Sequence, residues 1–351
     1  MFTKRIRRLF GSVSANVIYI TSPENLRYFS GFTGGEGALI LQPGACTLFT
    51  DSRYLVQAAA EAPDCEICDT AQHKAADALK DLAPETIGFE SGFVTHAAAK
   101  RLFEALPQAE WVGVDEEILM QRAVKDAQEL ELTRQAAALA DDAFSHVLPH
   151  LRPGVRELDV ALELEWYMRQ NGASAASFPI ICASGLRSAL PHGVAGEKVL
   201  AEGDFVTMDF GCFYNGYASD MTRTVVLGKA SLQQKTVYDT VLRAQEAGLA
   251  AICAGKTGSA ADRAARQMIS EAGYGDYFGH ALGHGTGLQI HEQPVLSTRS
   301  QTVLKPNMLV TVEPGIYIEG FGGVRIEDLV IVTEEGCENL THSDKQLLEI
   351  V

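Results

Sequence analysis

The stretch FVTMDFGCFYNGYASDMTRT, residues 205–224, carries the strongest fold signal in the chain. Apolar runs flank Tyr214-Asn-Gly216, and Asn-Gly is a preferred centre for a two-residue β-hairpin turn. We therefore predict two antiparallel strands, one with Asp209 and one with Asp220. In a hairpin with an even loop, the numbers of paired residues add to an odd sum. Because 209 and 220 do so, both carboxylates are expected on one face of the sheet.

A second acidic pair repeats this arrangement further along the chain. Glu313 follows the apolar run Leu309–Val312, and Glu327 follows Val324-Arg-Ile326. The sum of 313 and 327 is even, so these carboxylates share a face only if the connecting loop is odd or bulged. The intervening Ile318-Glu-Gly-Phe-Gly322 is rich in glycine, and we predict such a loop there.

Four carboxylates on apolar strands predict a cation site. Like charges that face one another destabilise a sheet, and each buried anion costs several kcal/mol of desolvation. Arg223 could neutralise one aspartate, but the second pair would remain unexplained. Two divalent ions would balance all four charges, and oxygen ligands favour Mn²⁺, Mg²⁺ or similar ions. Sites with two metal ions typically hydrolyse peptide or phosphate bonds.

Histidines gather in the same half of the sequence. His280 and His284 lie in the glycine-rich segment Gly279–Gly287, His291 follows closely, and His192 lies in Pro191-His-Gly193. A lone histidine is usually a surface or core residue. Three histidines beside a glycine-rich loop, together with four spaced carboxylates, favour a functional site.

The chain of 351 residues is long enough for two domains. Up to about residue 122, short apolar strands alternate with helical stretches, which predicts a small α/β domain over residues 1–122 and a second domain over 123–351. The expected elements of the first domain are strands at 17–20, 38–41, 48–50 and 86–89 and a helix over 71–82.

The second domain shows signs of an internal repeat. Helices are expected at 121–148, 155–170, 231–254 (with Ser231 and Gln234 as a capping box) and 259–272. Gly154 to Gly172 and Gly255 to Gly273 have the same spacing, and an acidic strand follows each unit. We therefore predict two similar halves.

Composition excludes several classes of partner. The formal net charge of −16 argues against nucleic acid and against an anionic membrane surface. No apolar run is long enough to span a bilayer. Seven scattered cysteines argue against a disulfide framework and for a reducing, cytoplasmic location, and Cys65 and Cys68 lack further zinc ligands nearby.

Taken together, these motifs resemble the pita-bread metallopeptidase family, in its Xaa-Pro aminopeptidase and prolidase branch. The matching segments are MDFG around Asp209, SDMTRT around Asp220, GHGTG around His284, IHE around His291, VEPGIY around Glu313 and GVRIED around Glu327. The segments Tyr28–Gly37 and Thr50–Tyr54 resemble the creatinase-type first domain. The resemblance implies a creatinase-like α/β domain followed by a pita-bread catalytic domain with a pseudo-two-fold repeat.

The resemblance also implies roles for individual residues. Two divalent ions, Mn²⁺ first and Co²⁺ or Zn²⁺ as alternatives, would be held by Asp209, Asp220, His284, Glu313 and Glu327. Glu313 would also act as general base, and His192 and His291 would stabilise the tetrahedral intermediate. The substrate side would comprise His280, Phe178, Tyr317 and Arg325. Family members are commonly dimers, so a homodimer is expected.

The predicted activity is hydrolysis of the Xaa-Pro bond at a peptide N-terminus, as by an Xaa-Pro aminopeptidase. The alternative is an Xaa-Pro dipeptidase, which needs a cation for the carboxylate of the product proline. Some prolidases place an arginine just after the His-Glu motif, but His291–Val295 has none and only Arg299 is near. A more distant alternative is an inactive binding module; the retention of all five ligands argues against it.

Overall fold

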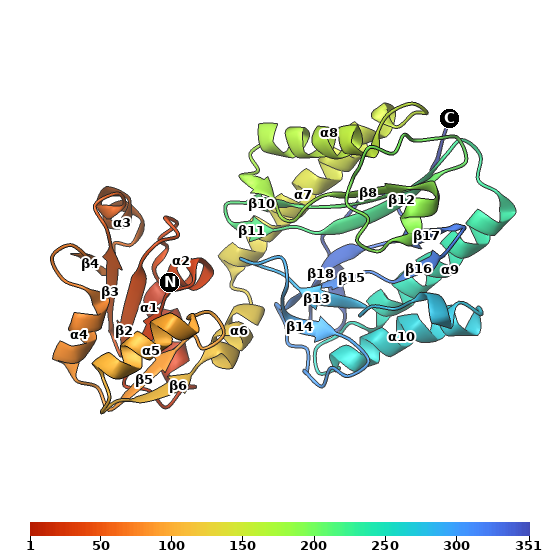
Figure 1. The fold of residues 1–351 in the computed structure, drawn as a ribbon. Helices are drawn as coiled ribbons and strands as arrows, with labels where there is room; N and C mark the ends of the chain where they lie inside the picture. The colour runs from red at the N-terminus through yellow and green to blue at the C-terminus, as the bar shows by residue number, and fades with distance from the viewer. The chain divides into compact units, whose positions relative to one another are not determined.

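The computed structural model describes all residues 1–351, and the chain divides into two units, Met1–Gln121 and Arg122–Val351. The first unit runs from red to orange in Figure 1, and the second from yellow to blue. Each unit has its own sheets and its own hydrophobic core.

The first unit is built on a mixed six-stranded sheet with the order β4-β3-β2-β1-β5-β6. The pairs β1/β2 and β2/β3 are antiparallel, while β3/β4, β1/β5 and β5/β6 are parallel. Its strands are β1 Val17–Ile20, β2 Ala38–Gln42, β3 Ala45–Thr50, β4 Glu66–Asp69, β5 Thr86–Phe89 and β6 Glu110–Gly113. Its helices are α1 Phe2–Phe10, α2 Pro23–Ser30, α3 Leu55–Glu61, α4 Ala75–Leu82, α5 His96–Ala105 and α6 Asp115–Ala123, which runs into the second unit. The α/β character and the four expected strands are confirmed.

The helix expected over 71–82 begins only at Ala75. Asp69 forms a turn instead, because its side chain accepts a hydrogen bond from the backbone N–H of Ala71. Side chains of this kind compete with the helix for backbone donors.

The sequence argued against a disulfide framework, and the structure contains a single disulfide among seven cysteines. Cys46 and Cys65 form this disulfide, with their Cα atoms 4.7 Å apart. The register of β3 and β4 explains the pairing, because Thr47 lies opposite Glu66 and the two cysteines occupy the preceding positions. This proximity depends on long-range strand pairing, which cysteine spacing alone does not reveal.

In the second unit, helices α7 and α8 lie on one side of the strands, and α9 and α10 lie on the other (Figure 1). These helices span Ala127–Val147, Glu157–Gln170, Leu232–Ala251 and Gly258–Glu271, and short 3₁₀ turns span η1 Leu148–His150, η2 Gly185–Ala189 and η3 Gly275–Tyr277. The strands of the first half are β7 Ala175–Ala176, β8 Ile181–Ser184, β9 Phe205–Phe210, β10 Cys212–Tyr214, β11 Tyr217–Ala218 and β12 Met221–Leu227. Those of the second half are β13 Gly283–Gly285, β14 Glu292–Leu296, β15 Leu309–Val312, β16 Gly315–Ile318, β17 Gly322–Arg325, β18 Asp328–Val332, β19 Cys337–Asn339 and β20 Glu349–Ile350, which pairs with β12.

The predicted internal repeat is confirmed. Helices α8 and α10 have the same length and start 101 positions apart, at Glu157 and Gly258. The glycines before them, Gly154 and Gly255, both have positive φ, at 96° and 83°. The capping box of Ser231 and Gln234 at the start of α9 is also present.

The single helix expected over residues 121–148 is instead two helices. The first, α6, ends at Ala123, and Val124 then forms an isolated bridge with Met308. Asp126 starts α7 through a capping box with Glu129. The Ala- and Leu-rich composition concealed this break, although Asp followed three positions later by Glu is itself a capping signal.

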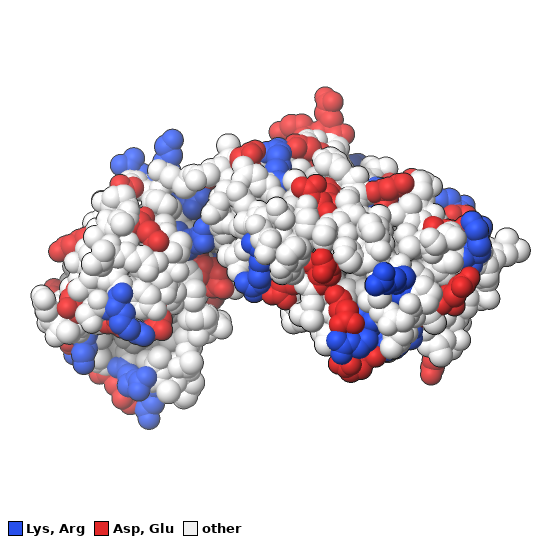
Figure 2. Space-filling view, turned by 90° about the horizontal axis from the view of Figure 1, so that it is seen from above, with Lys and Arg blue, Asp and Glu red and all other residues white.

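On the face shown in Figure 2, basic and acidic side chains are interspersed and form no continuous basic surface. None of the helices is both long and apolar enough to cross a membrane.

Candidate metal centre

The first hairpin places Asp209 and Asp220 on one face, as predicted. Strands β9 and β12 pair with Asp209 opposite Thr222, so Asp220, two residues before Thr222, lies diagonally across from Asp209 on the same face. The turn at Asn215 and Gly216 has positive φ at both residues (44° and 77°), as a two-residue hairpin turn requires.

The second hairpin places Glu313 opposite Glu327. Strands β16 and β17 are joined by the three residues Glu319–Phe321, which is the odd loop that the numbering demanded. The same register continues between β15 and β18 on the far side of the two glutamates. The backbone N–H of Glu327 donates to the carbonyl of Thr222 (3.1 Å), which brings the second carboxylate pair beside the first.

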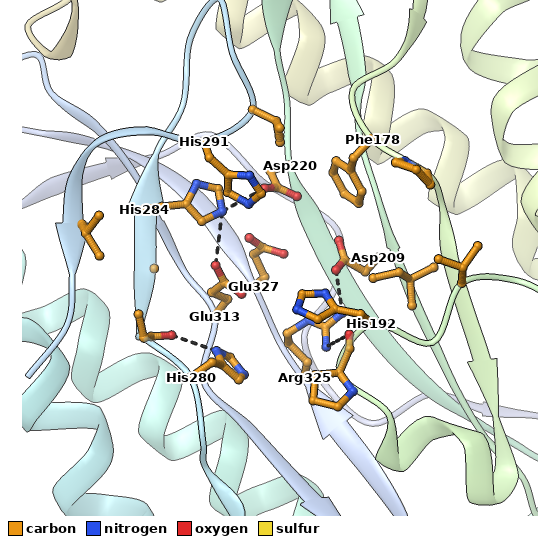
Figure 3. Close-up of a pocket in the computed structure, with 18 of the residues that line it drawn as sticks. Phe178, His192, Asp209, Asp220, His280, His284, His291, Glu313, Arg325 and Glu327 are labelled. Atoms are coloured by element: carbon orange, nitrogen blue, oxygen red, sulfur yellow. Dashed lines mark hydrogen bonds and ion pairs between the residues drawn. The ribbon is translucent and has the colours of Figure 1, made fainter. Parts of the chain in front are cut away.

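All the predicted site residues line one cavity of about 420 Å³. They are Phe178, His192, Asp209, Asp220, His280, His284, His291, Glu313, Tyr317, Arg325 and Glu327. A cavity of this size suits a small ligand. Figure 3 shows Asp220, His284, Glu313 and Glu327 pointing toward one another, with His291 beside His284.

His284 is oriented toward the carboxylates. Its Nδ1 lies 3.0 Å from the carbonyl oxygen of Gly285, which can only accept a hydrogen bond, so Nδ1 carries the hydrogen in the neutral ring. Nε2 then presents its lone pair 3.5 Å from Asp220 Oδ2 and 3.4 Å from Glu313 Oε1 (Figure 3). This tautomer is the one that a metal ligand needs.

Burial and mutual repulsion oppose the ionisation of three of the carboxyls. Desolvation first, and the neighbouring carboxylates second, raise the pKa values of Asp220 and Glu327 well above their usual range. Burial likewise raises the pKa of Glu313 to about 8. Burial lowers the pKa of His284, so its ring is neutral at pH 7. These three carboxyls and the neutral His284 ring therefore carry no positive charge.

The unsatisfied atoms fit divalent ions. Asp209 Oδ1 and Glu327 Oε1 are buried without any hydrogen-bond partner, which is costly for a carboxylate oxygen. One ligand atom from each of Asp220, His284 and Glu327 lies within 4.8 Å of the other two. Carboxylate oxygens with one imidazole nitrogen suit ions such as Mn²⁺, Co²⁺ or Zn²⁺.

Arg325, and not Arg223, neutralises one aspartate. Arg325 Nη2 donates to Asp209 Oδ2 at 2.5 Å, and Arg325 Nε donates to Thr222. Arg223 is buried and forms an ion pair with Asp328 instead, at 2.8 Å. The sequence alternative in which Arg223 pairs with Asp209 or Asp220 is therefore wrong, because side chains alternate along β12 and Arg223 points to its other face.

His280 and Tyr317 continue the chain of hydrogen bonds from Arg325. Arg325 Nη1 donates to the Tyr317 hydroxyl, which lies 2.9 Å from His280 Nε2. His280 Nδ1 donates to the carbonyl of Ala281, so both ring nitrogens are engaged within the protein. Burial lowers the pKa of His280 to about 4, and the ring is neutral at pH 7.

The remaining predicted residues lie around the cavity with freer side chains. His192 and His291 are exposed, and neither ring forms a hydrogen bond within the chain. The rings of His291 and His284 have centroids 4.4 Å apart, and Phe178 is partly buried in the wall. Arg299 is exposed and does not line the cavity.

Sequence reasoning missed the side chains that hold two of the predicted ligands in place. The Thr222 hydroxyl donates to Glu327 Oε2 (2.7 Å), and the Thr311 hydroxyl donates to Glu313 Oε1 (3.0 Å). Each threonine lies two positions from an acidic residue on one strand face, at Asp220 and Glu313, and this period could have revealed both.

Glu292 was also missed, although it stands beside His291. It is buried and accepts hydrogen bonds from Arg122 and from Lys125. It also accepts from the backbone N–H of Gln289 at 3.0 Å, which fixes the loop between His284 and His291. No local pattern pointed to partners that lie so far away in the sequence.

Comparison with known proteins identifies the family of the chain. Residues 131–334 match the metallopeptidase family M24, and residues 3–124 match the creatinase/prolidase N-terminal domain. An Xaa-Pro dipeptidase from Pyrococcus furiosus is 39% identical over 95% of this chain and 96% of its own. The structure of an Xaa-Pro dipeptidase from Bacillus anthracis has a TM-score of 0.95 and 46% identity, covering 99% of both chains. An X-Pro aminopeptidase from Thermotoga maritima has a TM-score of 0.91 and 39% identity, covering 98% of this chain and 100% of its own.

The fold and the cavity thus define a hydrolase of the metallopeptidase class. The chain belongs to metallopeptidase family M24 and carries a creatinase/prolidase N-terminal domain.

Proposed function

We propose that the protein is an Xaa-Pro dipeptidase that uses two divalent metal ions. The observation that carries this proposal is the group of four carboxylates around His284, with two buried carboxylate oxygens left unbonded. The relatives named Xaa-Pro dipeptidases, at 46% and 39% identity, support the dipeptidase over the aminopeptidase expected from the sequence.

The ions would be held by Asp209, Asp220, His284, Glu313 and Glu327. Mn²⁺ is our first choice, with Co²⁺ or Zn²⁺ as alternatives, because oxygen donors dominate the set. When bound, the ions would activate a water molecule and polarise the scissile carbonyl.

The side chains of the protein supply the proton transfers and the orientation. Glu313 accepts the proton of the attacking water and delivers it to the prolyl nitrogen as the C–N bond breaks. Arg325 fixes Asp209, and Tyr317 couples Arg325 to His280. Phe178 and the His280 ring face offer apolar surface to the proline ring.

The two unpartnered imidazoles act on the substrate. His291, next to His284, donates a hydrogen bond to the oxyanion of the tetrahedral intermediate. His192 shares that role in our sequence-based hypothesis. It can also donate a hydrogen bond to the carboxylate of a dipeptide, because the lining arginine, Arg325, is engaged by Asp209.

Hydrolysis of Ala-Pro and Ala-Pro-Ala, each with Mn²⁺ and with a chelator, tests the proposal. Metal-dependent cleavage of Ala-Pro, with little cleavage of the tripeptide, is expected. Efficient cleavage of the tripeptide would support the aminopeptidase, which the relative from Thermotoga maritima and the position of Arg299 outside the cavity favour. Cleavage of neither peptide would contradict both functions and revive the inactive binding module.

A second experiment tests the role of His192. His192→Gln should lower kcat/KM for Ala-Pro by about tenfold or more, since hydrogen bonds to charged groups contribute about 1.5–3 kcal/mol. Ala-prolinamide, which lacks the carboxylate, should lose much less. Equal losses for the two substrates would assign His192 to the oxyanion alone.

Three further features belong to the proposal. We assign residues 1–122 and 123–351 to separate domains and expect a homodimer, which sedimentation would reveal.

We place the enzyme in the cytoplasm because five cysteines are unpaired. The Cys46–Cys65 pair points the other way, so thiol titration of protein prepared from cells without reductant tests the location.

A further inference from the structure

A second group of metal-ligand side chains lies on helices α7 and α8, outside the cavity. His146 lies in the last turn of α7, His150 ends the 3₁₀ turn that continues it, and Glu163 faces them from α8. One ligand atom from each lies within 4.8 Å of the other two. We propose that these three side chains bind a divalent transition-metal ion of the kind that favours imidazole, such as Zn²⁺ or Ni²⁺.

The distances suit a single ion with small adjustments. His146 Nε2 lies 2.6 Å and His150 Nε2 lies 3.9 Å from the same oxygen, Glu163 Oε1. Bonds of about 2.0–2.1 Å to one ion place neighbouring tetrahedral ligands about 3.3 Å apart. The ion would replace the proton that His146 and Glu163 now share. All three side chains reach solvent, with exposed fractions of 27%, 47% and 30% for His146, His150 and Glu163, so they can adjust by this amount.

The ring of His150 is already set for metal binding. Its Nδ1 lies 3.1 Å from the carbonyl oxygen of His146, which only accepts, so the neutral ring carries hydrogen on Nδ1. Nε2 then turns its lone pair toward Glu163 Oε1. Metal-binding histidines typically have their other ring nitrogen fixed in this way.

The ring of His146 is held by packing. It stacks on Tyr167, with centroids 4.4 Å apart and planes 24° apart, and lies 5.0 Å from the ring of His150. A surface ion pair would explain why His146 and Glu163 lie together. It would not explain why His150 turns its Nε2 toward the same carboxylate. Two imidazoles and one carboxylate, with solvent free to complete the set, are a recurrent zinc ligand combination.

The internal repeat provides a comparison within the same chain. The positions 101 residues after His146, His150 and Glu163 are Ala247, Ala251 and Ala264, so the second helix pair has none of these ligands. The shared scaffold therefore does not require polar residues there.

Trp166 reports on this site. Its ring lies 6.1 Å from that of His146, and the chain has one other tryptophan, Trp111. In a Trp111→Phe enzyme already loaded with Mn²⁺, Ni²⁺ should quench the fluorescence of Trp166 with saturation at one site. His150→Gln and Glu163→Gln should each raise the half-quenching concentration by about tenfold or more, while His96→Gln, an exposed histidine elsewhere, should leave it unchanged.

The outcome decides the proposal directly. Quenching that does not saturate, that needs millimolar Ni²⁺, or that is unaltered in both site variants would overturn it. Both positions are partly exposed, so the variants should fold; if circular dichroism shows that one does not, the other decides. The readout does not depend on peptidase activity, so its failure is distinct from failure of the proposed function.

Discussion

The two halves of the second unit share a scaffold but contribute differently to the metal centre. In the first half, β8 (Ile181–Ser184) runs beside β9 and provides no predicted ligand. In the second half, β13 is Gly283-His-Gly285, and His284 is the one nitrogen among the predicted ligands. The repeat therefore supplies the paired carboxylates, whereas the glycine-rich segment of the second half supplies the imidazole.

The difference extends to how the carboxylates are held. Asp209 is paired with Arg325, whereas Glu313 is bonded by the neutral hydroxyl of Thr311 and has its pKa raised to about 8 by burial. In the proposed function, the first half thus contributes a predicted ligand neutralised by an arginine, Asp209, and the second half contributes the predicted general base, Glu313.

The largest expected effect separates these two residues. Glu313→Gln should lower kcat by about 10²–10⁴-fold, because a general base contributes that much. Asp209→Asn should be rescued in part by higher Mn²⁺ concentration, and Glu313→Gln should not. Glu319→Gln, an exposed glutamate in the adjacent loop, is the matched control. Equal rescue of both variants would remove Glu313 from the role of base.

Replacing Glu292 tests the loop between His284 and His291, which belongs to the second half only. Glu292→Gln should destabilise the protein by about 3–5 kcal/mol, because Arg122 and Lys125 lose a buried partner. Glu197→Gln, which breaks an exposed ion pair with Arg156, should cost no more than about 0.5 kcal/mol. Denaturant unfolding measures both, and similar values for the two variants would contradict the account.

Metal removal should reveal the repulsion among the carboxylates. The pKa values of these carboxyls are raised in the folded state, so between about pH 7 and pH 8, where His280 and His284 are neutral in both states, the folded protein holds more protons than the unfolded one. The free energy of unfolding of the metal-free protein should therefore fall by a few kcal/mol as pH rises through this window. With saturating Mn²⁺ the fall should disappear; a fall of equal size with and without metal would refute this view.

The smallest effect concerns Tyr317, which links Arg325 to His280. Tyr317→Phe should reduce kcat/KM by up to about tenfold, since one neutral hydrogen bond contributes about 0.5–1.5 kcal/mol. Tyr277→Phe, at a tyrosine that is 41% exposed and lies outside the cavity, is the control. A loss of more than about 100-fold would mean that the Tyr317 hydroxyl takes part in the chemistry itself.

Sequence reasoning reached the carboxylate geometry because it depends on local rules. The parity of residue numbers and one Asn-Gly turn were enough to place Asp209 with Asp220, and an odd glycine-rich loop was enough for Glu313 and Glu327. The cluster of all four was then expected on grounds of charge.

Other features depend on contacts that sequence distance conceals. The Cys46–Cys65 disulfide follows from the register of β3 and β4, and the partners of Glu292 lie 167 and 170 positions away. Arg223 is close to both aspartates in the sequence. Side chains alternate between the two faces of β12, however, so Arg223 points away from them and pairs with Asp328.

The number of Mn²⁺ ions bound per chain tests the central claim most directly. It should be measured by elemental analysis on the His150→Gln enzyme, so that the proposed site on α7 and α8 does not contribute. The account predicts two ions, and fewer than two after Glu327→Gln is added. No bound ion, or an unchanged number in the Glu327→Gln variant, would contradict it.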